Sequence, residues 1–176
     1  MKILIVVDYQ KDFVDKALGF KGAELLDEGI SALIRQYIQN GDVVIVTYDT
    51  HQKNYLSTQE GRKLQVEHCI EGTDGWELYG KTGDTVRELT SNKLIKVKKE
   101  TFGSLELASI LRGINPSEIT FVGIVTNMCV ISNAVIAKAA CPEAEIFINK
   151  ALTDSFDPEL RQKALDVMAS MQMEIY

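Results

Sequence analysis

Residues 3–7 read Ile-Leu-Ile-Val-Val and lead directly into Asp8. Four further short runs, rich in branched apolar residues, follow along the chain: 43–46 (VVIV), 94–97 (LIKV), 119–122 (ITFV) and 145–148 (EIFI). Apolar runs of this length are typical of strands that are covered on both faces, as in a parallel sheet. We therefore predict five parallel strands, with a short sixth strand at residues 173–176.

Helical patterns separate these runs, and we predict helices over residues 25–39, 104–112, 127–140 and 157–171. Asn40-Gly41 and Gly113 are expected to end the first two helices, and Asp157-Pro158 is expected to cap and begin the last. Strands that alternate with helices imply right-handed crossovers. The predicted fold class is α/β, a doubly wound, mainly parallel sheet with helices on both faces, in one domain spanning residues 1–176.

Composition excludes several classes of protein. The 176 residues include 19 Lys and Arg against 25 Asp and Glu, a formal net charge of −6, so we expect no nucleic-acid partner. No apolar run approaches the ~20 residues of a membrane span. The chain enters an apolar run within three residues of its start and has three cysteines, an odd number. We therefore expect no signal peptide, no membrane contact, free thiols and a cytoplasmic location.

Residues 49–81 lack convincing periodicity, and irregular segments of this length are often functional. Polar residues also follow the predicted strands at Asp8, Asp49, Lys98-Lys99 and Asn149, and Val125 follows another. Because ligands of open α/β sheets bind beyond the carboxyl ends of the strands, we expect these residues to converge on one edge.

Cys129 follows a predicted strand and turn, in the first turn of a predicted helix. A free cysteine is often a small core residue. At a helix N-terminus, however, unpaired N–H groups favour the thiolate and can stabilise an oxyanion. Asp8 is then a candidate general base, with a helix cap as its alternative, and Lys98 or Lys99 a candidate charge to orient both groups. A phosphatase aspartate would want a second carboxylate where this chain has Gln10.

Both histidines of the chain, His51 and His68, lie in the irregular segment, near Asp49 and Glu60. Two imidazoles with one or two carboxylates suit Zn, Mn or Fe and leave positions open for water or substrate. Isolated histidines in loops are mostly surface residues, which is the alternative. The spacing nevertheless predicts a metal site formed by these four residues.

Five motifs in order resemble the isochorismatase-like cysteine hydrolases and cover most of the chain: 7–13 (VDYQKDF), 49–51 (DTH), 67–73 (EHCIEGT), 99–104 (KETFGS) and 123–130 (GIVTNMCV). Within this superfamily, the Asp-x-His motif and the later histidine resemble the nicotinamidase (pyrazinamidase) type.

The resemblance implies an amidase that hydrolyses nicotinamide to nicotinate and ammonia, in NAD salvage. Cys129 attacks the carboxamide carbon, Asp8 takes the thiol proton, and water releases nicotinate from a thioester. Lys99 completes the triad by its spacing from Phe102, with Lys98 in reserve. The backbone N–H groups of Val125 and Cys129 form the oxyanion hole.

The same resemblance implies that Asp49, His51, Glu60 and His68 hold one divalent ion, Zn first and Mn or Fe as alternatives, which binds the pyridine nitrogen. Phe13 and Phe102 are implied as substrate-binding residues. The peptide bond between Ile124 and Val125 is expected to be cis, and the protein to form a homo-oligomer.

Two departures bear on the substrate. Gln65-Val66 stands where many nicotinamidases have an aromatic residue followed by proline, and Phe102 stands where a tyrosine is common. A related hydrolase of another small amide is therefore an alternative, whereas Cys129 argues against an isochorismatase itself. The remaining alternative is a flavodoxin-like binding module. It would want a loop rich in Ser, Thr or Gly after the first strand, where this chain has two aspartates.

Overall fold

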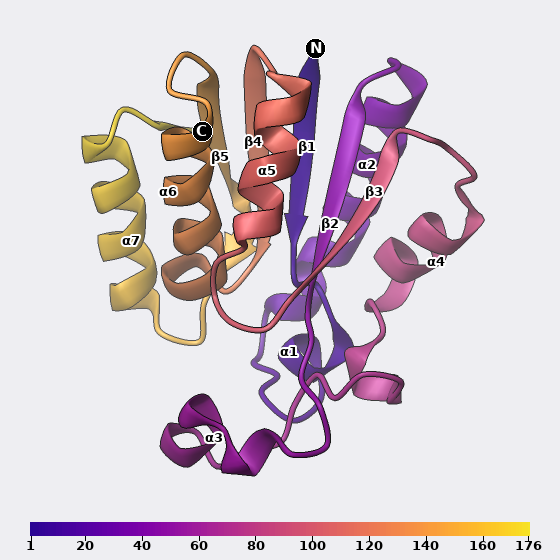
Figure 1. The fold of residues 1–176 in the computed structure, drawn as a ribbon, viewed down its shortest axis with the longest axis vertical. Helices are drawn as coiled ribbons and strands as arrows, with labels where there is room; N and C mark the ends of the chain where they lie inside the picture. The colour runs from indigo at the N-terminus through magenta and orange to yellow at the C-terminus, as the bar shows by residue number, and fades with distance from the viewer.

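The computed structural model describes residues 1–176 and contains one sheet of six strands (Figure 1). In chain order the strands are β1 Lys2–Val7, β2 Val43–Asp49, β3 Leu94–Lys99, β4 Glu118–Ile124, β5 Glu145–Asp154 and β6 Glu174–Ile175. Their order in the sheet is β3-β2-β1-β4-β5-β6, and every neighbouring pair is parallel. The predicted doubly wound sheet is confirmed, and it is parallel throughout.

Seven α-helices connect the strands: α1 Lys11–Val14, α2 Asp27–Gln39, α3 Gln59–Lys63, α4 Gly80–Glu88, α5 Leu105–Ile114, α6 Ile131–Ala140 and α7 Pro158–Ser170. Short 3₁₀ turns lie at Ala23–Leu26, Tyr55–Ser57 and Asp74–Trp76, and a π-helical turn at Thr126–Val130 precedes α6. None of the helices combines the length and apolar character needed to cross a bilayer.

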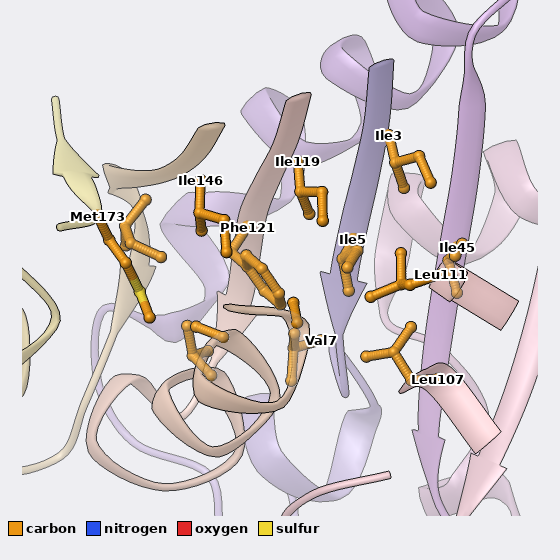
Figure 2. Packing of buried hydrophobic residues seen from close by; sticks show 14 of the residues in the cluster. Ile3, Ile5, Val7, Ile45, Leu107, Leu111, Ile119, Phe121, Ile146 and Met173 are labelled. Atoms are coloured by element: carbon orange, nitrogen blue, oxygen red, sulfur yellow. The ribbon is translucent and has the colours of Figure 1, made fainter. Parts of the chain in front are cut away.

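The core has one layer on each side of the sheet. On one side Ile3, Ile5 and Val7 pack with residues of α5, α6 and α7 such as Leu107 (Figure 2). On the other side Leu4 and its alternating neighbours pack with α2 and α4. Successive strand residues point to opposite faces, and both faces of β1 are buried. This explains why the strand is continuously apolar rather than alternating.

Local signals placed most helix ends correctly. The Asp157 carboxylate accepts hydrogen bonds from the N–H groups of Glu159 and Leu160, both at 3.0 Å, as expected of a cap. The prediction that Gly113 ends its helix was wrong, because α5 continues to Ile114 and the left-handed residue is Asn115, with a φ of 51°.

Helix α4 was not predicted. Its sequence contains two glycines and has little intrinsic preference for helix. The helix is stabilised from a distance, since the Asp27 carboxylate on α2 accepts hydrogen bonds from the N–H groups of Lys81 and Thr82 at its N-terminus, each at 2.8 Å. A cap supplied across the fold is not visible in the local sequence.

Strands β2 and β3 lie on one side of β1, and β4, β5 and β6 lie on the other. This topological switch point between β1 and β4 leaves a crevice at the carboxyl ends of the two strands. Gly123 allows the backbones of β4 and β1 to approach each other closely there, because a Cβ at this position would lie 2.2 Å from the carbonyl oxygen of Val7. The expectation that Asn149 reaches this edge was wrong. Strand β5 continues beyond it to Asp154, and the Asn149 side chain instead accepts a hydrogen bond from the N–H of Ala151.

Candidate active site

Asp8 is the first residue after β1, and its side chain is fully buried. The hydroxyl of Thr47, on the neighbouring strand β2, donates a hydrogen bond to Asp8 Oδ1 at 2.6 Å and accepts one from the Asp8 N–H at 3.2 Å. Asp8 has a φ of 45°, a left-handed conformation that aspartate tolerates better than most residues. One threonine hydroxyl thus holds both the backbone and the carboxylate of Asp8 at the crevice.

Lys99 ends β3, and its side chain is only 1% exposed. The ammonium nitrogen lies 2.6 Å from Asp8 Oδ2 and 3.1 Å from Asp49 Oδ1, and it donates a hydrogen bond to the carbonyl of Thr101. Lys98 points away, where it pairs with the exposed carboxylate of Glu71. Alternation along the strand therefore brings Lys99, and not Lys98, to Asp8.

Cys129 lies in the π-helical turn, with its sulfur 3.5 Å from the Lys99 ammonium. The peptide bond between Ile124 and Val125 is cis, as expected. Two N–H groups of the turn, those of Met128 and Val130, donate to the carbonyl of Val125, whereas the N–H of Val125 has no hydrogen-bond partner within the protein. A free donor therefore lies at the start of the turn that presents the thiol.

The expectation that the thiol is a stabilised thiolate was wrong. Burial raises the pKa of the Cys129 thiol well above its ordinary value, and the carboxylates of Asp8 and Asp49 raise it further, against the opposing charge of Lys99. The loss of solvation and the two carboxylates outweigh the favourable charge of Lys99. The resting sulfur therefore keeps its proton, and attack requires a base.

Asp8 and Lys99 have the properties that such a step needs. Burial raises the pKa of Asp8, with Lys99 acting against this effect, so the carboxylate is more basic than an exposed aspartate. Burial lowers the pKa of Lys99, but the charges of Asp8 and Asp49, and that of Cys129 whenever it is ionised, raise it well above its ordinary value. The lysine consequently stays an ammonium beside the two carboxylates.

A second cluster joins the same crevice. Asp49 ends β2, and residues 69–71 return alongside His51, whose N–H donates to the carbonyl of Cys69 at 2.9 Å. This pairing brings His68 close, and the ligand atoms of Asp49, His51 and His68 all lie within 4.8 Å of one another. Glu60 Oε1, on α3, lies 3.6 Å from His51 Nε2 and 3.8 Å from His68 Nε2.

The chemistry of these donors suits a divalent ion. His68 donates from Nδ1 to the carbonyl of Val66 at 2.8 Å, which turns Nε2 toward Asp49 Oδ2, as in histidines that ligate metals. Burial tends to raise the pKa of Asp49, but hydrogen bonds with His51 and His68 and the charge of Lys99 hold it well below its usual range. A buried carboxylate that stays ionised beside two imidazoles fits the predicted metal site.

One cavity of about 380 Å³ is lined by Cys129 of the first cluster and by Asp49, Glu60 and His68 of the second. The remaining lining is mostly apolar: Phe13, Leu18, Leu64, Phe102, Val125, Met128 and Phe156. The ring of Phe13 lies 5.5 Å from that of His68, whereas Phe102 is 46% exposed at the edge. The cavity therefore offers an apolar slot for a flat ring whose polar end faces the thiol.

Comparison with known proteins agrees with this geometry. Residues 2–175 match the family described as the isochorismatase domain. The chain belongs to the isochorismatase family. A nicotinamidase/pyrazinamidase structure from Bacillus subtilis has a TM-score of 0.91 at 27% identity and covers 99% of this chain and 98% of its own.

Two further structures resemble this isochorismatase-family chain closely. A pyrazinamidase/nicotinamidase from Streptococcus mutans has a TM-score of 0.91 at 26% identity, with 100% of both chains covered. A pyrazinamidase from Pyrococcus horikoshii, described in complex with zinc, has a TM-score of 0.85 at 25% identity and covers 99% of this chain and 98% of its own. The predicted family and fold are thus confirmed over the whole chain.

Three buried polar residues that support the site carry no clear signal in the sequence: Thr47, Gln10 and Asp12. A weak signal existed for Thr47, which precedes Asp49 by two residues in a strand and so shares its face. The Asp12 carboxylate accepts a hydrogen bond from the N–H of Cys69 at 2.7 Å, beside His68. Such contacts across 57 residues of sequence leave no local pattern.

Proposed function

We propose that this protein is a nicotinamidase-type amidase that hydrolyses nicotinamide to nicotinate and ammonia. The observation that carries the proposal is the contact of Lys99 with both Asp8 and Cys129, the last of which lines a mostly apolar cavity. The names of the relatives from Bacillus subtilis and Streptococcus mutans support the same substrate class.

In the first half of the reaction, the Cys129 sulfur attacks the carboxamide carbon while Asp8 accepts the thiol proton. The carbonyl oxygen takes the negative charge, and the N–H groups of Val125 and Cys129 are the proposed donors to it. Asp8 then returns the proton to the amide nitrogen, the C–N bond breaks and ammonia leaves. A thioester remains on Cys129.

In the second half, water attacks the thioester carbon and Asp8 takes a proton from it. The C–S bond breaks, the proton passes from Asp8 to the sulfur, and nicotinate is released. Lys99 stays charged beside Asp8 throughout, so it offsets negative charge on the carboxylate or the sulfur without exchanging a proton. One carboxylate therefore acts as a base and then as an acid in each half of the reaction.

Asp49, His51, Glu60 and His68 are the proposed holders of one divalent ion. Zinc is the first candidate because the Pyrococcus horikoshii relative is described with zinc, and Mn or Fe are alternatives. The bound ion would take the pyridine nitrogen as a ligand and so orient the ring. Phe13, which lies against His68, is placed to contact the face of that ring.

Ammonia release from nicotinamide by zinc-loaded protein tests the proposal. Cys129→Ala should abolish release, whereas Cys141→Ala, a matched change at another buried cysteine, should leave it within about threefold of the parent. Quenching in acid during turnover should reveal a nicotinoyl adduct on the peptide that contains Cys129. Turnover that survives Cys129→Ala would refute the nucleophile, and no turnover by the parent would refute the substrate.

The product and the fold lead to three further expectations. We expect the enzyme to act in NAD salvage, to be cytoplasmic and to form a homo-oligomer. Light scattering of the purified protein measures the last of these directly. A protein that stays monomeric at micromolar concentration would contradict it.

A further inference from the structure

Gln10 lies two residues after the candidate base Asp8, and none of its surface is exposed. Its side-chain amide makes three hydrogen bonds. Oε1 accepts from the N–H of Asp49 at 2.8 Å, while Nε2 donates to the carbonyl of Asp49 at 2.9 Å and to that of Trp76 at 2.8 Å. The amide therefore binds both backbone groups of one residue.

These hydrogen bonds lie where β2 extends beyond the end of its pairing with β1. Strand β2 pairs with β3 as far as Asp49 and Lys99, but on its other side the pairing with β1 ends at Val46. Beyond that point the backbone of β2 has lost its neighbour on the β1 side. The Gln10 amide, with one acceptor and two donors, takes the place of the missing strand.

Asp49 connects the two clusters of the site. Its Oδ2 lies 3.0 Å from His51 Nε2, and its Oδ1 lies 3.1 Å from the Lys99 ammonium. The backbone of Asp49 is held by β3 on one side and by the Gln10 amide on the other. Its carboxylate therefore keeps its contacts with His51 and Lys99 at the same time. A shift of this backbone would move a candidate metal ligand and a partner of the catalytic lysine at once.

We propose that Gln10 is a positioning residue for the metal centre, acting through the backbone of Asp49. The inference rests on the proposed metal-dependent function, since it assigns a residue to the preorganisation of that site. Partners that orient metal ligands typically contribute about 10–100-fold in metal affinity. Gln10 differs from the usual case in that it holds the backbone of the ligand rather than its side chain.

The test is Gln10→Met, which keeps the length of the side chain and removes all three hydrogen bonds. Zinc affinity is measured by competition with a chelator, and the absorption spectrum of the cobalt-loaded protein reports ligand geometry. We expect affinity to fall by about 10–100-fold and the cobalt spectrum to change. Gln10→Asn, which withdraws the amide by one methylene group, should show the same effect in smaller measure.

A matched control separates positioning from a general loss of stability. Ser31→Ala removes a buried hydrogen bond of 2.8 Å to Thr85 between α2 and α4, away from the site. It should lower the melting temperature yet leave zinc affinity and the cobalt spectrum unchanged. All proteins are compared at a temperature where circular dichroism shows them folded, and if Gln10→Met does not fold, Gln10→Asn decides.

The outcomes distinguish this inference from the proposed function. Equal zinc affinity in the parent and the Gln10 variants would overturn the positioning role, as would an equal loss in Ser31→Ala. A parent protein that binds no divalent ion would refute the metal site itself. A parent that binds zinc but does not hydrolyse nicotinamide would refute only the substrate.

Discussion

Replacing Lys99 with Met would leave two buried carboxylates facing each other without the ammonium between them. At an effective dielectric constant of about 20, contacts of 2.6 Å to Asp8 and 3.1 Å to Asp49 correspond to attractions of about 6 and 5 kcal/mol. The cost of burying the ammonium offsets much of this. Removal of one partner from a buried ion pair typically costs about 3–5 kcal/mol, and we expect that loss at neutral pH.

The loss should depend on pH in a defined direction. Burial already raises the pKa of Asp8, and the removal of Lys99 would raise it further. Between the ordinary aspartate pKa of about 4 and this raised value, the folded variant holds a proton that the unfolded chain has released. Its stability therefore falls as the pH rises, so the deficit against the parent should be largest at pH 8.5 and smallest near pH 5.

Urea unfolding of metal-free protein, followed by far-ultraviolet circular dichroism at pH 5, 7 and 8.5, measures this. The matched control is Lys98→Met, a neighbouring lysine that is 56% exposed and pairs with Glu71 at the surface. It should change stability and turnover little, whereas Lys99→Met should also lower turnover by at least ~100-fold. Equal deficits in the two variants, or a Lys99→Met deficit that does not vary with pH, would contradict the role of Lys99 between the two carboxylates.

Three further predictions follow from the same contacts. Thr47→Val should lower the free energy of unfolding by about 1–3 kcal/mol and reduce kcat more than it raises KM, because Asp8 loses both of its hydrogen bonds to the Thr47 hydroxyl. An unchanged kcat would count against this. Zinc at a hundred times its Kd should raise the free energy of unfolding of the parent by about 2.7 kcal/mol, measured by urea unfolding, and His68→Ala should lose this gain. Equal stabilisation of both proteins would exclude His68 as a ligand. In metal-free protein without substrate, Cys129 should react with iodoacetamide more slowly than free cysteine does at pH 7, because burial raises the pKa of the thiol. For the same reason its reaction rate should still be rising with pH at pH 10. A rate that levels off below pH 7 would contradict this prediction.

Much of the fold could be predicted because its signals are local. The five apolar runs became β1 to β5 of the sheet, and the cap at Asp157 lies where its sequence placed it. Helix α4 escaped prediction because the Asp27 carboxylate that caps it comes from α2, more than 50 residues earlier. Strand β5 ran past Asn149 for a related reason, since its continuation depends on pairing with β4.

The candidate site divides in the same way. The types and order of the reactive residues were visible in the sequence, because Asp8, Asp49 and Lys99 each stand at the end of an apolar run. Their protonation was not. The neighbourhood of Cys129 in the sequence suggested a thiolate, whereas its buried position raises the pKa of the thiol and assigns the proton to the sulfur at rest.

The alternation of strands and helices, the side chains at the strand ends and the family resemblance were all visible in the sequence. The fold was needed to show that Lys99 rather than Lys98 meets Asp8, that the Cys129 thiol is buried, and that Gln10 holds the backbone of Asp49. Periodicity and capping act over only a few residues, so they can be recognised locally. Desolvation and hydrogen bonds across the sheet, in contrast, depend on which distant segments the fold brings together.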